Sequence, residues 1–299
     1  MNWTPDLNGF KAYLQLERSL SENSIEAYLR DVDKLVQFFE TISLEISPTK
    51  VTDNHLTDFI NWIGEIGLGA RSQARIISGL KAFYNYLIME DRITIDPTEL
   101  ISMPTLGRKL PEVLAIEEIN AMIAAIDLSK AEGERNRAII ETLYSCGLRV
   151  SELVNLQLSH VLFEEGFLRV TGKGNKERLV PMGKVAIKYI LYYLEATRNH
   201  TKIKKGDHDI LFLNRRGGRL TRVMIFTIVK NLALLADIDK TVSPHTFRHS
   251  FATHLIDGGA DLRAVQEMLG HESITTTEIY THLDVGYLKD TITQFHPRA

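Results

Sequence analysis

The chain has 299 residues, of which 44% are hydrophobic and 24% charged, a composition typical of a folded globular protein with room for two domains. Its one cysteine, Cys146, excludes an internal disulfide and a cysteine-based zinc cluster, and the lack of any long apolar run excludes a membrane span. The net charge of −3 disfavours a nucleic-acid partner unless basic residues gather locally. We expect a cytoplasmic protein, since the chain does not start with a basic and apolar leader.

Residues 1–94 carry four helical patterns and no strand signal. The opening helix holds Phe10 and Leu14, and the second begins after Ser21, a predicted N-cap. A third pattern follows Thr52. The fourth helix has an apolar stripe on one face and two basic residues, one turn apart, on another. These are Ile76, Leu80, Phe83 and Leu87 on the apolar face, and Arg71 and Arg75 on the basic one.

Residues 95–111 contain three prolines, Pro97, Pro104 and Pro111, and therefore predict an extended linker. From residue 112 onward, strand patterns at 161–163, 167–171 and 177–182 predict a small antiparallel sheet. Most of the remaining segments show helical periodicity. The predicted helices are 116–126, 135–145, 184–198, 221–236, 245–257, 261–269 and 275–293. The expected fold is mainly α with one small antiparallel β-sheet.

Two cationic residues of the second domain lie within two residues of a glycine. Arg149 follows Gly147 by two residues, and the freedom of glycine allows a sharp turn that delivers the arginine at a helix start. A simple ion pair with Glu152, three residues later, explains Arg149 as well. Lys173 lies at a predicted hairpin tip, where it could reach a ligand or remain a solvated turn. The loop lacks the glycine–lysine–hydroxyl pattern of a nucleotide-binding loop, so no nucleotide cofactor is predicted.

The predicted helix 245–257 presents His245 and Arg248 three residues apart, on one face. Pro244 suits its first turn, and apolar residues at four-residue steps anchor it in the core: Phe247, Phe251 and Leu255. A zinc site at His245 and His249 is disfavoured because Thr246 stands where a zinc peptidase helix has glutamate. We therefore predict no metal.

A histidine and a tyrosine follow that helix. His271 comes directly after Gly270, which predicts a helix end, and Tyr280 lies nine residues further on. Tyr287 is the competing tyrosine. Two arginines, a lysine and two histidines can hold a phosphate and move its protons, and a tyrosine can attack it.

Six residues in this order resemble the active-site set of the tyrosine site-specific recombinases, and in particular the Xer group: Arg149, Lys173, His245, Arg248, His271 and Tyr280. The similarity covers nearly the whole chain, including its last residues, Phe295-His296-Pro297-Arg298-Ala299. It implies a four-helix, SAM-like core-binding domain at 1–94 that clamps DNA, a linker at 95–111 and a catalytic domain at 112–299. A tail at 284–299 would dock onto a neighbouring protomer. Its apolar stripe could equally pack within its own domain: Leu288, Ile292 and Phe295.

Cleavage of a phosphodiester builds negative charge on the non-bridging oxygens, and Arg149 and Arg248 are suited to hold them. The resemblance implies that Tyr280 attacks, that His245 assists as base and that His271 supports the phosphate and the nucleophile. It also implies that Lys173 protonates the leaving 5′-oxygen. The product would be a 3′-phosphotyrosyl enzyme. Because this ester conserves the energy of the broken bond, neither ATP, a metal nor another cofactor is expected.

The resemblance further implies a double-stranded DNA recombination site as substrate. Four protomers would assemble on it, either identical or paired with a related recombinase, in some relatives with a DNA translocase as activator. Basic clusters, one of which includes Arg178, supply the predicted DNA contacts: Arg71, Arg75, Lys176, Arg215 and Arg216. We expect resolution of chromosome dimers at a dif-like site at cell division. The alternatives are a phage or transposon integrase, a type IB topoisomerase, and a DNA-binding protein without catalysis.

Overall fold

The computed structural model describes residues 2–107, 112–172, 176–270 and 285–299, and it divides into two compact units, Met1–Lys109 and Leu110–Ala299. The fold is mainly helical, with a single three-stranded antiparallel sheet among the described residues, as predicted. Within the described ranges, no helix combines the length and the apolar character needed to cross a bilayer.

The first unit contains the four predicted helices: α1 Thr4–Leu16, α2 Glu22–Thr41, α3 Asp53–Glu65 and α4 Ala70–Met89. Thr52 caps α3 through its hydroxyl, which accepts from the His55 backbone N–H. Ser21 precedes α2 as predicted, but its hydroxyl pairs with that of Ser24 at 2.9 Å and not with a backbone N–H. The helices enclose an aromatic core in which Phe10, Phe59 and Phe83 are fully buried.

The second unit contains a three-stranded sheet in the order β1-β2-β3. Its strands are Val161–Leu162, Phe167–Thr171 and Glu177–Pro181. All pairs are antiparallel, with Leu162 opposite Phe167 and Thr171 opposite Glu177. Leu168 and Val170 of β2 point into the core, whereas Arg169 and Thr171 are exposed. This alternation is typical of a sheet with one buried face.

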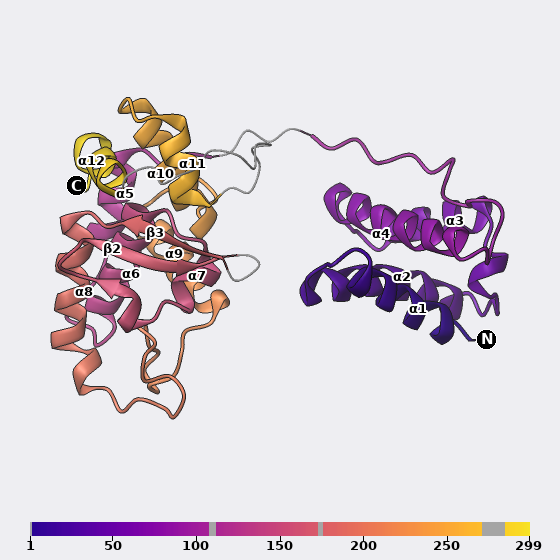
Figure 1. Cartoon of the computed structure of the whole chain (residues 1–299), viewed down its shortest axis with the longest axis horizontal. Helices are drawn as coiled ribbons and strands as arrows, with labels where there is room; N and C mark the ends of the chain where they lie inside the picture. Colours follow the sequence, from indigo (N-terminus) through magenta and orange to yellow (C-terminus); the bar gives the residue numbers. More distant parts are fainter. Residues whose placement is uncertain (1, 108–111, 173–175, 271–284) are drawn as a thin grey trace. The chain divides into compact units, whose positions relative to one another are not determined.

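Eight α-helices of the described residues complete the unit. In chain order they are α5 Ile116–Ala124, α6 Gly133–Cys146, α7 Val150–Val154, α8 Lys184–Ala196, α9 Arg222–Leu235, α10 Pro244–Asp257, α11 Leu262–Leu269 and α12 Val285–Phe295. Helix α6 is the central one, buried along most of its length and packed against α8 and α10. Helices α10, α11 and α12 gather at one end of the unit, where α11 and α12 contact β3 (Figure 1).

Several boundaries differ from the predictions. The strand predicted at 161–163 ends at Leu162, and the helix predicted at 184–198 ends at Ala196, because the backbone leaves the helical region at Thr197. Of the helix predicted at 275–293, residues 285–293 are helical and the helix continues to Phe295; residues 275–284 lie outside the described residues.

Candidate active site

Arg149 is delivered by a sharp turn between α6 and α7. Gly147 ends α6 with a φ of 56°, in the left-handed region, and Arg149 occupies the N-cap position of α7 with extended backbone. Its Nη1 donates to Glu152 Oε1 at 2.9 Å, and its backbone N–H donates to Glu152 Oε2 at 2.8 Å. The predicted turn and the alternative ion pair with Glu152 are therefore both present.

Arg248 comes from α10, whose start and packing follow the prediction. Ser243 caps the helix and Pro244 occupies its first turn, and the three apolar anchors are fully buried: Phe247, Phe251 and Leu255. Arg248 is itself 8% exposed and donates from Nη1 to Gly147 O at 2.7 Å and from Nη2 to Leu269 O at 2.5 Å. Burial, and then repulsion from the nearby Arg149, lowers the pKa of Arg248 to about 10, so the group remains a cation at neutral pH.

The two arginines meet at the C-terminal end of α11, together with a third. Three consecutive carbonyls there accept hydrogen bonds from three different guanidiniums. Met268 O accepts from Arg178 Nε at 2.8 Å, Leu269 O from Arg248, and Gly270 O from Arg149 Nη2 at 3.1 Å. The last carbonyls of a helix have no partner within the helix and carry its negative dipole end, which explains why cations gather at this point.

The remaining predicted catalytic residues are placed only in part. His245 is exposed in the first turn of α10, one turn before the buried Arg248. Lys173, His271 and Tyr280 lie outside the described residues. Their described neighbours adopt the predicted geometry. The Gly172 N–H donates to Lys176 O at 2.8 Å and closes the hairpin, and Gly270 ends α11 with a φ of 63°. Tyr287, the competing tyrosine, is 43% exposed on α12.

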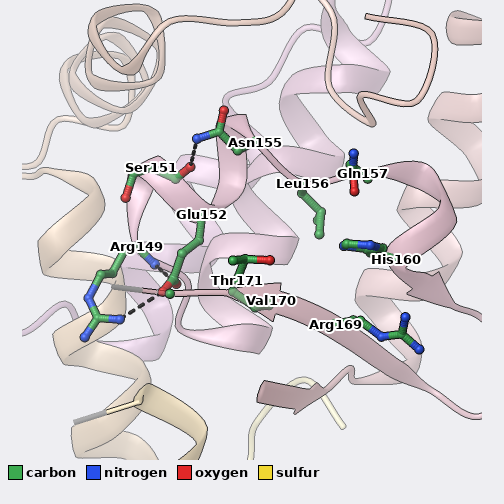
Figure 2. Close-up of a pocket in the computed structure, with 11 residues that line it drawn as sticks. Arg149, Ser151, Glu152, Asn155, Leu156, Gln157, His160, Arg169, Val170 and Thr171 are labelled. Atoms are coloured by element: carbon green, nitrogen blue, oxygen red, sulfur yellow. Dashed lines mark hydrogen bonds and ion pairs between the residues drawn. The ribbon is translucent and has the colours of Figure 1, made fainter. Parts of the chain in front are cut away.

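A pocket of about 360 Å³ opens beside Arg149, between α7 and β2. Figure 2 shows Arg149 and Glu152 at one end of the pocket and His160 and Arg169 at the other. The rest of its lining mixes polar and apolar residues: Ser151, Asn155, Leu156, Gln157, Val170, Thr171 and Gly172. Among the described residues, no group of three or more histidine, cysteine or acidic side chains is arranged to hold a metal ion.

The predicted DNA-contacting residues lie on several surfaces. Arg71 is exposed on α4, whereas Arg75 forms a 2.6 Å ion pair with the buried Asp31 of α2. Arg215 is exposed and pairs with Glu132, and Arg216 and Lys176 are exposed.

Helix α12 packs within its own unit. Leu288 and Ile292 are 3% and 2% exposed in a cluster with Phe251, and Phe295 packs against that cluster. His296 lies between Tyr144 and Phe251, with ring centroids 4.8 and 5.4 Å away. The predicted stripe is thus in contact with the chain's own core.

Two functional groupings were missed from the sequence. The sequence places Arg178 in a basic cluster, whereas in the structure it binds both Glu152 and the end of α11. Glu141 is fully buried on α6 between Arg137 Nε at 3.1 Å and Arg298 Nε at 3.6 Å. The partners of Arg178 come from distant segments and leave no local pattern in the sequence. Glu141 lies four residues after Arg137 on α6, a spacing that indicates a helical ion pair, whereas its other partner, Arg298, is distant in the sequence.

The Phage integrase family matches residues 112–286, and the phage integrase N-terminal SAM-like domain matches residues 7–91. Tyrosine recombinase XerD of Chlorobaculum tepidum is 44% identical over 99% of this chain and 98% of its own. Tyrosine recombinase XerD of Staphylococcus epidermidis is 43% identical over 96% and 97%.

A crystal structure of the XerH site-specific recombinase bound to a palindromic difH substrate, a post-cleavage complex, covers 92% of this chain and 81% of that one. It has a TM-score of 0.71 and 25% identity. The chain therefore belongs to the phage integrase family, in which it is a Xer-like tyrosine recombinase, an enzyme that cleaves and rejoins DNA through a tyrosine-linked intermediate.

Proposed function

We propose that this recombinase resolves chromosome dimers at a dif-like site in the cytoplasm, for segregation at cell division. The proposal is supported by the XerD names of relatives that are similar over nearly their full length, and by the difH substrate of XerH. The observation that carries it is the convergence of Arg149 and Arg248, whose acceptors Gly270 and Leu269 are adjacent residues.

Two converging guanidiniums are suited to the non-bridging oxygens of one scissile phosphate, through paired charge-assisted hydrogen bonds. The side-chain contacts described here occupy two of the five N–H donors of each arginine, so donors remain for a ligand. Tyr280 would attack the phosphorus, with His245 as base and His271 as a support. Lys173 would protonate the 5′-oxygen that leaves. A 3′-phosphotyrosyl ester would hold the strand until a second 5′-hydroxyl reverses the step.

The test is covalent capture on a nicked suicide substrate that carries a dif-like site. The wild-type protein should form a protein–DNA adduct that survives a denaturing gel. Tyr280→Phe should bind the same DNA without forming the adduct, and Tyr287→Phe, the matched control, should form it normally. EDTA should leave the yield unchanged. An adduct that persists in Tyr280→Phe and disappears in Tyr287→Phe would move the nucleophile to α12.

We assign residues 1–94 to a DNA clamp, residues 95–111 to a linker and residues 112–299 to the catalytic domain, with four protomers on each pair of sites. Strand exchange by a tetramer separates this function from that of a type IB topoisomerase, which relaxes DNA as a monomer. A recombinase should resolve a synthetic four-way junction into paired duplexes. Relaxation of supercoiled DNA without any junction resolution would favour the topoisomerase.

In that tetramer the tail at 284–299 would leave its own unit and bind the corresponding surface of a neighbouring protomer. On that surface, buried Glu141 would pair with Arg298, and the rings of Tyr144 and Phe251 would pack against His296, as they do within one chain. Truncation after Phe295 should leave binding to a single half-site intact and abolish the synaptic complex on a native gel. Normal synapsis by the truncated protein would remove the tail from assembly.

A further inference from the structure

Arg178 lies on β3 and binds two separate segments of the catalytic unit. Its Nη1 and Nη2 donate to the two carboxylate oxygens of Glu152, each at 2.9 Å, and its Nε donates to Met268 O at 2.8 Å. Only arginine offers this planar fork together with a third donor. The side chain is 14% exposed, so these contacts are shielded from water.

Glu152 connects Arg178 to Arg149. The same carboxylate that takes the Arg178 fork also accepts from the Arg149 backbone N–H at 2.8 Å and from Arg149 Nη1 at 2.9 Å. Its side chain is 3% exposed. Burial raises the pKa of Glu152, but the hydrogen bonds and charges of Arg178 and Arg149 together lower it below its ordinary value. The carboxylate is therefore ionised and fixed from two sides.

The arrangement also ties Arg149 to α11. Arg178 holds Met268 O, and Arg149 holds Gly270 O two residues later on the same helix end. Without Arg178, Glu152 would lose two of these four hydrogen bonds, and Arg149 would be the one cation left in them. The carboxylate would then draw the Arg149 guanidinium more strongly toward itself and away from any phosphate.

We propose that Arg178 is a positioning residue for strand cleavage, which holds Glu152 so that the Arg149 guanidinium stays directed at the scissile phosphate. This inference rests on the proposed role of Arg149 in neutralising the non-bridging oxygens. Loss of Arg178 should slow the chemical step and leave DNA affinity almost unchanged, because its guanidinium is largely buried and bound to Glu152 and Met268 O.

The experiment is single-turnover cleavage of the nicked suicide substrate, with either a phosphodiester or a methylphosphonate at the scissile position. The methylphosphonate carries a methyl group in place of one non-bridging oxygen, so it is neutral before attack and carries one negative charge fewer than the phosphodiester in the five-coordinate state. It therefore needs less neutralisation by Arg149. On the phosphodiester, Arg178→Gln should be about 10- to 100-fold slower than wild type, comparable to the loss of one stabilising donor. On the methylphosphonate, the two proteins should agree within about threefold.

Three variants make the result decisive. Arg149→Ala should show the same selective recovery on the methylphosphonate; if it does not, the proposed role of Arg149 is wrong. If Arg149→Ala recovers and Arg178→Gln does not, Arg178 has only a structural role and the inference fails. Arg263→Gln removes an exposed arginine from α11 and should match wild type on both substrates.

Two further variants cover the case in which Arg178→Gln does not fold. Arg178→Lys keeps the charge and loses the fork, and Glu152→Gln keeps the shape and loses the carboxylate charge. Both should show selective recovery on the methylphosphonate, with circular dichroism and half-site binding like those of wild type. Equal slowing on both substrates in these two variants would overturn the proposal.

Discussion

Gly147→Ala should destabilise the catalytic unit and displace both converging arginines. A Cβ atom at this position would lie 2.4 Å from Cδ1 of Phe251, whose ring is fully buried and cannot move aside. The backbone φ of 56° is also unfavourable for alanine. The left-handed conformation costs about 1–2 kcal/mol, and overpacking against a fixed core ring costs about 1–3 kcal/mol more. We expect a loss of about 2–5 kcal/mol in the free energy of unfolding.

Gly166→Ala is the matched control, in the same unit. Its φ is 77°, but the nearest atom to an added Cβ, Lys289 Cε, is 3.5 Å away, an ordinary contact. This variant should lose only the backbone contribution of about 1–2 kcal/mol. The difference between the two variants isolates the clash with Phe251.

Urea unfolding followed by far-UV circular dichroism measures both losses. The two tryptophans of the chain, Trp3 and Trp62, lie in the first unit, so their fluorescence gives a separate transition for that unit. Equal losses in Gly147→Ala and Gly166→Ala, within about 0.5 kcal/mol, would refute the steric reasoning. Because Gly147 O accepts from Arg248 at 2.7 Å, Gly147→Ala should also slow DNA cleavage by the folded protein.

Other predictions concern the DNA clamp and the tail. Arg71→Ala should leave stability within about 0.5 kcal/mol and reduce the slope of log affinity against log salt by about 1 if Arg71 binds a phosphate. Arg75→Ala should instead destabilise the first unit by about 1–3 kcal/mol, because it removes the ion-pair partner of Asp31. Burial already raises the pKa of Asp31 to about 6. Chemical unfolding should therefore show a loss of stability in Arg75→Ala and none in Arg71→Ala. Burial, and then repulsion from His254, lowers the pKa of His296 from 6.5 to about 3, so the packed tail requires neutral His296. As the pH falls below 6.5, tail packing should weaken by up to about 1.4 kcal/mol per pH unit, and His296→Leu should remove most of this slope in hydrogen exchange of α12.

The sequence predicted the helices well because capping residues, prolines and apolar spacing act within a few residues of each helix. Thr52 caps α3, Pro244 begins α10, and the apolar spacing of α4 matches its buried face. Where a predicted helix end was wrong, as for α8, contacts with residues distant in the sequence determine the end. At Thr197 the backbone leaves the helix and the 3₁₀ turn Arg198–His200 follows, fixed by hydrogen bonds from Arg198 to Ile210 O and Leu211 O.

The site was predicted as a set of residue types and not as a set of contacts. Sequence spacing indicated the Arg149–Glu152 pair, three residues apart, but not the second pair of Glu152, whose partner Arg178 is 26 residues away. The Arg149 contact with Gly270 spans 121 residues. Such contacts depend on how β3, α7 and α11 pack, and packing leaves no local periodicity in the sequence.

The charge balance of this cluster suits a transition state more than a substrate. Among the described residues, Arg149, Arg178 and Arg248 bring three positive charges to the end of α11, and Glu152 brings one negative charge, a net of +2. A phosphodiester carries a single negative charge, whereas the five-coordinate phosphorus formed by attack of an ionised tyrosine carries two. Groups that are already fixed favour the state in which the charge is greatest, because they do not reorganise as it develops. Burial is the main cause of the lowered pKa of Arg248, and repulsion from Arg149 adds to it. A doubly charged phosphorane between these guanidiniums would relieve that repulsion, so the crowding of positive charge favours cleavage.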